Sequence, residues 1–174
     1  MAMKTTNCSS LLVLLCVKSA FSLFVLFIIT IIIHEGAHYV TVLIFSIPIA
    51  HFAWFDTNYF APAFFSDSTE HSVGMTIVGY SGGLVTGVLL LSIFILKRKW
   101  FKQSVYKWLL GLYIVTFGFW QICQGILEGA FHQTYISNAS SLLFSSTHYI
   151  GYASAFLGMV LYWVFMPRLK ELKV

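Results

Sequence analysis

The stretch IIIHEGAHYV, residues 31–40, places two histidines and a glutamate inside a long apolar segment. An acidic side chain near the centre of a membrane helix costs on the order of 2.5–3.5 kcal/mol on insertion scales. Ionisable residues in such segments usually face the interior of a helix bundle and have a function. We therefore expect His34, Glu35 and His38 to have a function.

His34 to His38 form the pattern H-E-x-x-H, and the segment around them is predicted to be helical. Residues i and i+4 share one helix face, so both imidazoles can reach one metal ion. The glutamate between them can act as a general base toward a water molecule without being a ligand. We predict that His34 and His38 bind Zn²⁺ and that Glu35 is the catalytic base. Iron or cobalt would also suit this kind of ligand set.

The composition of the chain predicts a membrane protein. Its 174 residues are 59% hydrophobic and 9% charged, whereas about 25% of the residues of a soluble domain are charged. Four apolar segments are each long enough for a membrane-spanning helix of about 20 residues. They lie at about residues 19–47, 72–96, 108–131 and 147–166. We predict an all-α integral membrane protein, with residues 1–174 forming a single domain of four transmembrane helices in the lipid bilayer.

All ten basic residues fall on one side of this predicted bundle. They lie before the first span, between the second and third spans, and after the fourth: Lys4, Lys18, Lys97, Arg98, Lys99, Lys102, Lys107, Arg168, Lys170 and Lys173. Because cytoplasmic loops are rich in lysine and arginine, we predict a multi-pass protein of a plasma or inner membrane with both termini cytoplasmic. The net charge of +4 comes from these clusters and forms no basic face, so no nucleic-acid partner is expected.

The connections between the predicted helices carry two further signals. Residues 48–71 contain no Lys or Arg and are aromatic from His51 onward, so we expect an outer loop that is re-entrant or lies at the interface over the mouth of the bundle. Residues 9–17 are apolar and precede Lys18. They are expected to form an interfacial helix or an extension of the first span.

A catalytic zinc ion needs a third protein ligand, and depth in the membrane predicts which residue supplies it. At 1.5 Å per residue, His38 lies about 30 Å along its helix from Lys18, and Glu128 lies about 31 Å along its helix from Lys107. Glu128 is also the one acidic residue in the other three predicted spans. We therefore predict Glu128 as the third ligand.

The alternatives to Glu128 are histidines in the same outer half of the predicted bundle. His132 follows Glu128 by four residues and shares its helix face. His71 and His148 fall in or near the outer loops. Any of these three would serve as the ligand in place of Glu128, or they would bind a second metal ion.

A glycine pattern in the second predicted span indicates where helices approach closely. Gly79, Gly83 and Gly87 recur every four residues and so form one stripe on the helix. Small residues in such stripes let two membrane helices pack backbone against backbone. We predict that this stripe packs against a neighbouring helix.

The order of these motifs resembles that of the intramembrane zinc metalloproteases related to site-2 protease. Members of that family carry H-E-x-x-H in one membrane helix and a third ligand, the Asp of an L-D-G motif, two helices later. Their small bacterial relatives have a glycine-rich segment in the helix between. This chain has HEGAH at 34–38, VGYSGGLVTG at 78–87 and LEG at 127–129, so the resemblance covers about residues 25–130. The Asn and Pro that usually precede L-D-G are absent, and Gln121 and Gln124 occupy that stretch.

The resemblance implies a zinc endopeptidase that cleaves transmembrane or juxtamembrane segments of membrane-protein substrates. His34, His38 and Glu128 would be its metal ligands and Glu35 its base. The alternative is a non-catalytic accessory subunit that keeps a protease-like fold, with a structural or absent metal and membrane subunits as partners. A metal carrier or proton channel is a third reading, but it needs polar residues at matching depths in several spans, where this chain has few. Glu35 favours the enzyme, because a structural site needs no base.

Overall fold

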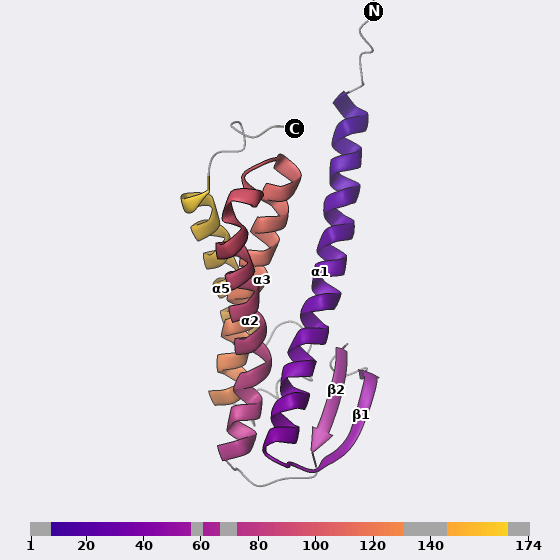
Figure 1. Cartoon of the computed structure of the whole chain (residues 1–174), viewed down its shortest axis with the longest axis vertical. Helices are drawn as coiled ribbons and strands as arrows, with labels where there is room; N and C mark the ends of the chain where they lie inside the picture. Colours follow the sequence, from indigo (N-terminus) through magenta and orange to yellow (C-terminus); the bar gives the residue numbers. More distant parts are fainter. Residues whose placement is uncertain (1–7, 57–60, 67–72, 131–145, 167–174) are drawn as a thin grey trace, which may run out of the picture.

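The computed structural model describes residues 8–56, 61–66, 73–130 and 146–166. In chain order these residues form helix α1 (Cys8–Ile44), strands β1 (Ile49–Asp56) and β2 (Ala61–Ser66), and helices α2 (Val73–Phe101), α3 (Val105–Ala130) and α5 (Ser146–Phe165) (Figure 1). Each helix overlaps one of the four predicted apolar segments. The described helices therefore confirm the prediction of a helical protein.

Three of these helices are long and apolar enough to cross a membrane. They are α1 with 37 residues, α2 with 29 and α3 with 26, all above the length of about 20 residues that a bilayer requires. In α5 the described apolar part, Tyr149–Phe165, is shorter. Large apolar side chains cover much of the exposed helix surface, as expected of a membrane-embedded protein.

Helix α1 is continuous from its beginning to the predicted metal-binding motif. Residues 9–17 form its start, so they are an extension of the first apolar segment rather than a separate interfacial helix. Lys18 lies inside the helix without interrupting it, which agrees with the good helix propensity of lysine. The turns of α1 that carry His34 and His38 therefore belong to the C-terminal part of one long, continuous helix.

Helix α1 ends in a Schellman motif. Ser46 has a positive φ of 53° and donates its N–H to the carbonyl oxygen of Leu43 at 3.1 Å. The N–H of Ile47 donates to the carbonyl oxygen of Val42 at 3.0 Å. Pro48 follows, and it cannot donate a hydrogen bond that would continue the helix. The chain therefore leaves the helix just beyond the predicted site.

Within the connection 48–71, the two strands correct the all-α prediction, while the re-entrant or interfacial position of this connection stays a prediction. Strands β1 and β2 pair antiparallel, with Phe52 opposite Phe64 and Ala53 opposite Ala63. The sequence of β1, IAHFAWFD, is rich in aromatic residues, which favour strands over turns. The hairpin lies beside the C-terminal half of α1, near the end of the bundle where α1 ends (Figure 1).

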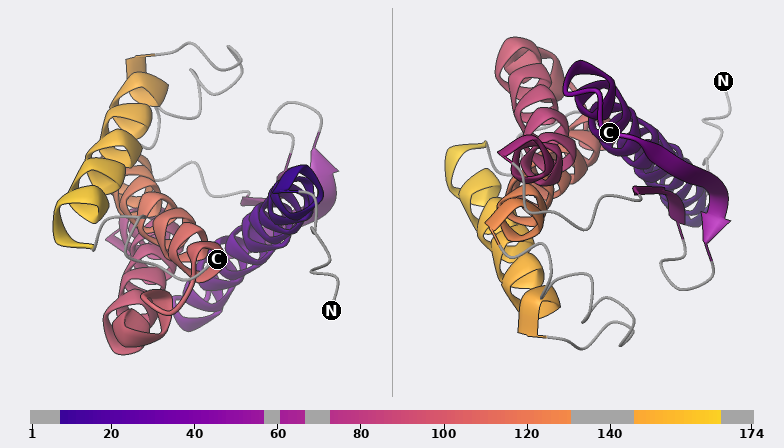
Figure 2. Two further views of the ribbon diagram at one scale, coloured as in Figure 1. Left: turned by 90° about the horizontal axis from the view of Figure 1, so that it is seen from above. Right: turned by 90° about the horizontal axis from the view of Figure 1, so that it is seen from below.

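Helices α2 and α3 lie between α1 and α5 when the molecule is viewed along its long axis (Figure 2). The predicted glycine stripe forms the contact between α2 and α3. A Cβ added at Gly79 would lie 2.9 Å from the carbonyl oxygen of Glu128, and one at Gly83 would overlap the backbone of Gln121 and Gly125. The prediction of close helix packing is confirmed, and this packing fixes the position of the α3 backbone near α1.

Candidate metal centre

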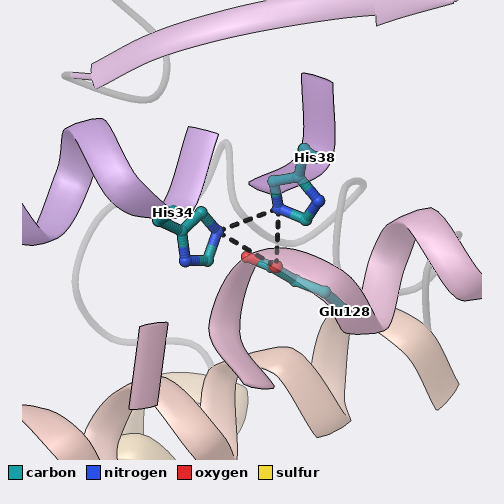
Figure 3. Close-up of side chains that lie close together, drawn as sticks. All are labelled: His34, His38 and Glu128. Atoms are coloured by element: carbon teal, nitrogen blue, oxygen red, sulfur yellow. Dashed lines mark hydrogen bonds and ion pairs between the residues drawn. The ribbon is translucent and has the colours of Figure 1, made fainter. Parts of the chain in front are cut away.

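His34 and His38 of α1 and Glu128 of α3 converge in the bundle (Figure 3). The two imidazole Nε2 atoms are 2.9 Å apart. The Oε2 atom of Glu128 lies 3.3 Å from Nε2 of His34 and 3.4 Å from Nε2 of His38. Three atoms at these separations can all lie about 2.0–2.1 Å from one point, which is the usual length of zinc–nitrogen and zinc–carboxylate bonds. The cluster therefore fits a metal ion with three protein ligands.

The hydrogen bonds of the two imidazoles determine which nitrogen carries the proton. Nδ1 of His34 lies 2.6 Å from the side-chain oxygen of Gln121, and Nδ1 of His38 lies 2.7 Å from the carbonyl oxygen of Val78. Both oxygens can only accept a hydrogen bond, so each Nδ1 donates. A metal-binding histidine usually donates its second nitrogen to a neighbouring acceptor in this way. Each Nε2 atom then carries the lone pair that a metal ligand needs.

This proton arrangement brings three electron-rich atoms into one small space. In neutral imidazoles that are protonated at Nδ1, both Nε2 atoms present lone pairs, and they face each other and the carboxylate oxygen of Glu128. Like partial charges at this distance repel each other, and the repulsion is strong where water is excluded. A single proton bridges one pair of these atoms, whereas a metal ion contacts all three. The donor set therefore fits a cation.

The carboxylate of Glu128 has one satisfied oxygen and one that lacks a donor. Its Oε1 accepts a hydrogen bond from the side-chain nitrogen of Gln124 at 3.0 Å. Its Oε2, which faces the imidazoles, is buried and accepts no hydrogen bond within the described part of the chain. Burying a carboxylate oxygen without a partner costs free energy. A divalent cation would supply that partner and balance the negative charge.

Glu35 lies in the same turn of α1 as the histidines but outside the ligand cluster. The ligand atoms that lie within 4.8 Å of one another belong to His34, His38 and Glu128. The Glu35 side chain is half-buried and makes no hydrogen bond among the residues that the structure describes. Glu35 therefore keeps the sequence position of the base in H-E-x-x-H, and its role as a base stays a prediction.

Helix α2 contributes a glycine and a carbonyl group to the cluster. A Cβ added at Gly82 would overlap Nε2 of His38 and lie 2.7 Å from Nε2 of His34. One turn earlier in the same helix, the carbonyl group of Val78 accepts the proton of His38. The α2 backbone therefore approaches the imidazoles closely, and only the absence of a side chain at position 82 leaves them room.

Some of these contributions are absent from the sequence-based prediction. Val78 and Gly82 give no signal of their own, because a carbonyl group is common to every residue and Gly82 stands next to a glycine of the packing stripe. Gln121 and Gln124 do give a signal, since they are amides within an apolar segment. The alternative ligands His71 and His132 lie outside the described residues, and the side chain of His148 does too.

Replacing Gly82 by alanine is expected to lower zinc affinity by about 5–150-fold, the equivalent of the 1–3 kcal/mol that overpacking costs. The added Cβ would displace the imidazoles, although no ligand is removed. Competition with a chromophoric chelator in detergent measures the affinity. Gly36→Ala is the matched control, because a Cβ there meets no described atom within 4 Å. Equal affinities for the two variants would show that α2 does not shape the centre.

Comparisons of this chain with protein-family models, with curated proteins and with solved structures give no match. The geometry of the site is therefore what supports a metal centre: two imidazoles and a carboxylate from α1 and α3 lie close together, and a glycine of α2 lies against the imidazoles.

Proposed function

We propose that this chain is a membrane-embedded zinc endopeptidase that cleaves transmembrane or juxtamembrane segments of other membrane proteins. The observation that carries the proposal is the convergence of His34, His38 and Glu128 on a space that suits one metal ion, with Glu35 outside the ligand set. Two histidines and a base on one helix, with a third ligand from elsewhere, are typical of zinc peptidases. The motif order that resembles the site-2 protease group points to the same reaction.

In the proposed hydrolysis, the metal ligands and the base have separate roles. Zinc held by the two histidines and Glu128 would act as a Lewis acid toward the scissile carbonyl and activate a water molecule. Glu35 would accept a proton from the attacking water and deliver it to the nitrogen of the leaving fragment. A carbon–oxygen bond forms and the carbon–nitrogen bond of the peptide breaks, so no further reactant is needed.

The proposed topology has four membrane spans, with α5 as the fourth and both termini in the cytoplasm. Nζ of Lys18 lies 5.5 Å from the centre of the Tyr106 ring at the start of α3. Arg98 donates a hydrogen bond to the carbonyl oxygen of Phe165 at the end of α5. Basic side chains thus gather at one end of the bundle, which the positive-inside rule assigns to the cytoplasmic face of a plasma or inner membrane. The metal centre lies toward the other end, so the substrate would meet it in the outer half of the bilayer.

Metal removal tests the proposal. The chain is reconstituted in phospholipid vesicles with single-span reporter proteins that carry a tag on each side of the membrane. We expect about one zinc ion per chain, as for a site with three protein ligands, and reporter cleavage in or beside the membrane segment. Cleavage should stop when a chelator removes the metal and return when zinc is added. Stoichiometric zinc with no cleavage of any reporter would refute the peptidase and leave the metal site.

One observation favours a second candidate, a non-catalytic subunit with a structural metal. Much of α1 is exposed, while His34 and His38 are among its few buried residues, so a metal ion would tie α1 to α3. If the metal is only structural, its removal by a chelator lowers the melting temperature of the protein, and no reporter protein is cleaved with or without the metal. The partners would then be other membrane subunits that cover the exposed part of α1.

A further inference from the structure

We propose that Gln121 and Gln124 are the positioning residues of the metal centre, one for an imidazole and one for the carboxylate. This inference rests on the proposed metal binding by His34 and Glu128. It assigns a role to the two amides of α3, which the peptidase mechanism does not use. Both glutamines belong to the helix that supplies the third ligand.

Gln121 determines the tautomer and the ring orientation of His34. Its Oε1 accepts the proton on Nδ1 of His34 at 2.6 Å. With that proton fixed on Nδ1, Nε2 keeps the lone pair that a metal ion needs. Without an acceptor at this place, the ring is free to rotate or to carry its proton on Nε2, and both changes remove the ligand atom.

The backbone of Gln121 is itself held in place by the glycine stripe. A Cβ at Gly83 would overlap the carbonyl oxygen of Gln121, so α2 and α3 touch at this level. The close contact of two backbones leaves little freedom for the start of the Gln121 side chain. The packing of α2 against α3 therefore helps to fix the position of the Gln121 side chain, which accepts the hydrogen bond from His34.

Gln124 plays the corresponding part for the carboxylate. Its Nε2 donates to Oε1 of Glu128 at 3.0 Å, and the two residues are four apart on one face of α3. With Oε1 engaged, Oε2 is the oxygen that points to the imidazoles. The amide thus orients the carboxylate so that its other oxygen faces the imidazoles.

A merely structural role for Gln121 makes the opposite prediction about substitutions. An amide in an apolar helix costs free energy unless it is hydrogen-bonded. If Gln121 only fills space, leucine is harmless there, and a glutamate is costly at membrane depth. If Gln121 positions His34, leucine removes the acceptor, whereas the carboxylate of glutamate accepts the same proton from Nδ1.

Cobalt binding to the full chain in detergent separates these possibilities, because Co²⁺ gives absorption bands that depend on its ligands. We expect Gln121→Leu to lower Co²⁺ affinity by about 10–100-fold and to change the bands, as loss of such a partner does at other metal sites. Gln121→Glu should stay within a few-fold of wild type and keep the bands. Gln124→Leu should also weaken binding. Melting curves of the metal-free proteins by circular dichroism show that each variant is folded.

Gln103→Leu is the matched control, since Gln103 is an exposed amide that bonds Lys107 far from the ligands; its affinity should equal that of wild type. If Gln121→Leu binds Co²⁺ like wild type while Gln121→Glu binds weakly, the positioning role is refuted and the metal site stands. If wild type takes up no Co²⁺, the proposed function fails and this inference fails with it.

Discussion

Replacing Glu35 by glutamine is expected to slow reporter cleavage by about 10²–10⁴-fold, the usual contribution of a general acid–base group. Glutamine has nearly the same shape as glutamate but cannot accept the proton of the attacking water. Because Glu35 lies outside the cluster formed by His34, His38 and Glu128, the variant should still bind one metal ion per chain. Initial cleavage rates in vesicles and metal content by mass spectrometry test both parts.

Glu171→Gln is the matched control for this experiment, because it makes the same change in charge outside the predicted centre. It should cleave at the wild-type rate. Cleavage by Glu35→Gln at the wild-type rate would remove Glu35 from the mechanism. Loss of the metal from Glu35→Gln would instead mean that Glu35 holds the ligand cluster together.

Removing the carboxylate of Glu128 should release the metal. Structural zinc sites with four ligands bind with about 10–16 kcal/mol, so one ligand contributes about 2.5–4 kcal/mol, or on the order of 10²–10³ in affinity. Glu128→Ala is therefore expected to lower zinc affinity by that factor. It leaves His34 and His38 facing each other with their Nε2 atoms 2.9 Å apart. Competition titration against a zinc chelator measures the loss.

Glu128→Asp is the control that separates loss of charge from loss of reach. It keeps the carboxylate but shortens its side chain by one methylene, so an intermediate affinity is expected. If Glu128→Ala binds zinc like wild type, Glu128 is not a ligand. His132, the alternative in the sequence, would then be tested by His132→Ala in the same titration.

The helices and the ligand cluster could be anticipated from sequence for simple physical reasons. The apolar segments mark the helices, because a membrane helix must hide its backbone polar groups and expose apolar side chains to lipid. The depth of Glu128 could be counted from Lys107, since the rise per residue of a helix is constant. Glu128 does lie beside His38 in the structure, although it comes from a different helix.

The hairpin and the role of α2 could not be anticipated in the same way. Residues 49–56 and 61–66 pair with each other and β2 lies against α1, but the aromatic residues of this connection favour a strand only where the pleated surface finds neighbours to pack against, and the sequence does not show those neighbours. The adjacent residues Gly82 and Gly83 serve different neighbours, one the imidazoles of α1 and the other the backbone of α3. Hydropathy does not determine how α2 is rotated about its axis, so it could not assign either one.

Because the proposed ligands come from both α1 and α3, the candidate centre has a consequence for biosynthesis. The histidines enter the membrane with the first long helix, but their carboxylate partner arrives only with the third. A nascent chain that has inserted only α1 and α2 holds two imidazoles without their third donor. If the proposed metal site forms, its complete ligand set would therefore become available only after α3 has been synthesised.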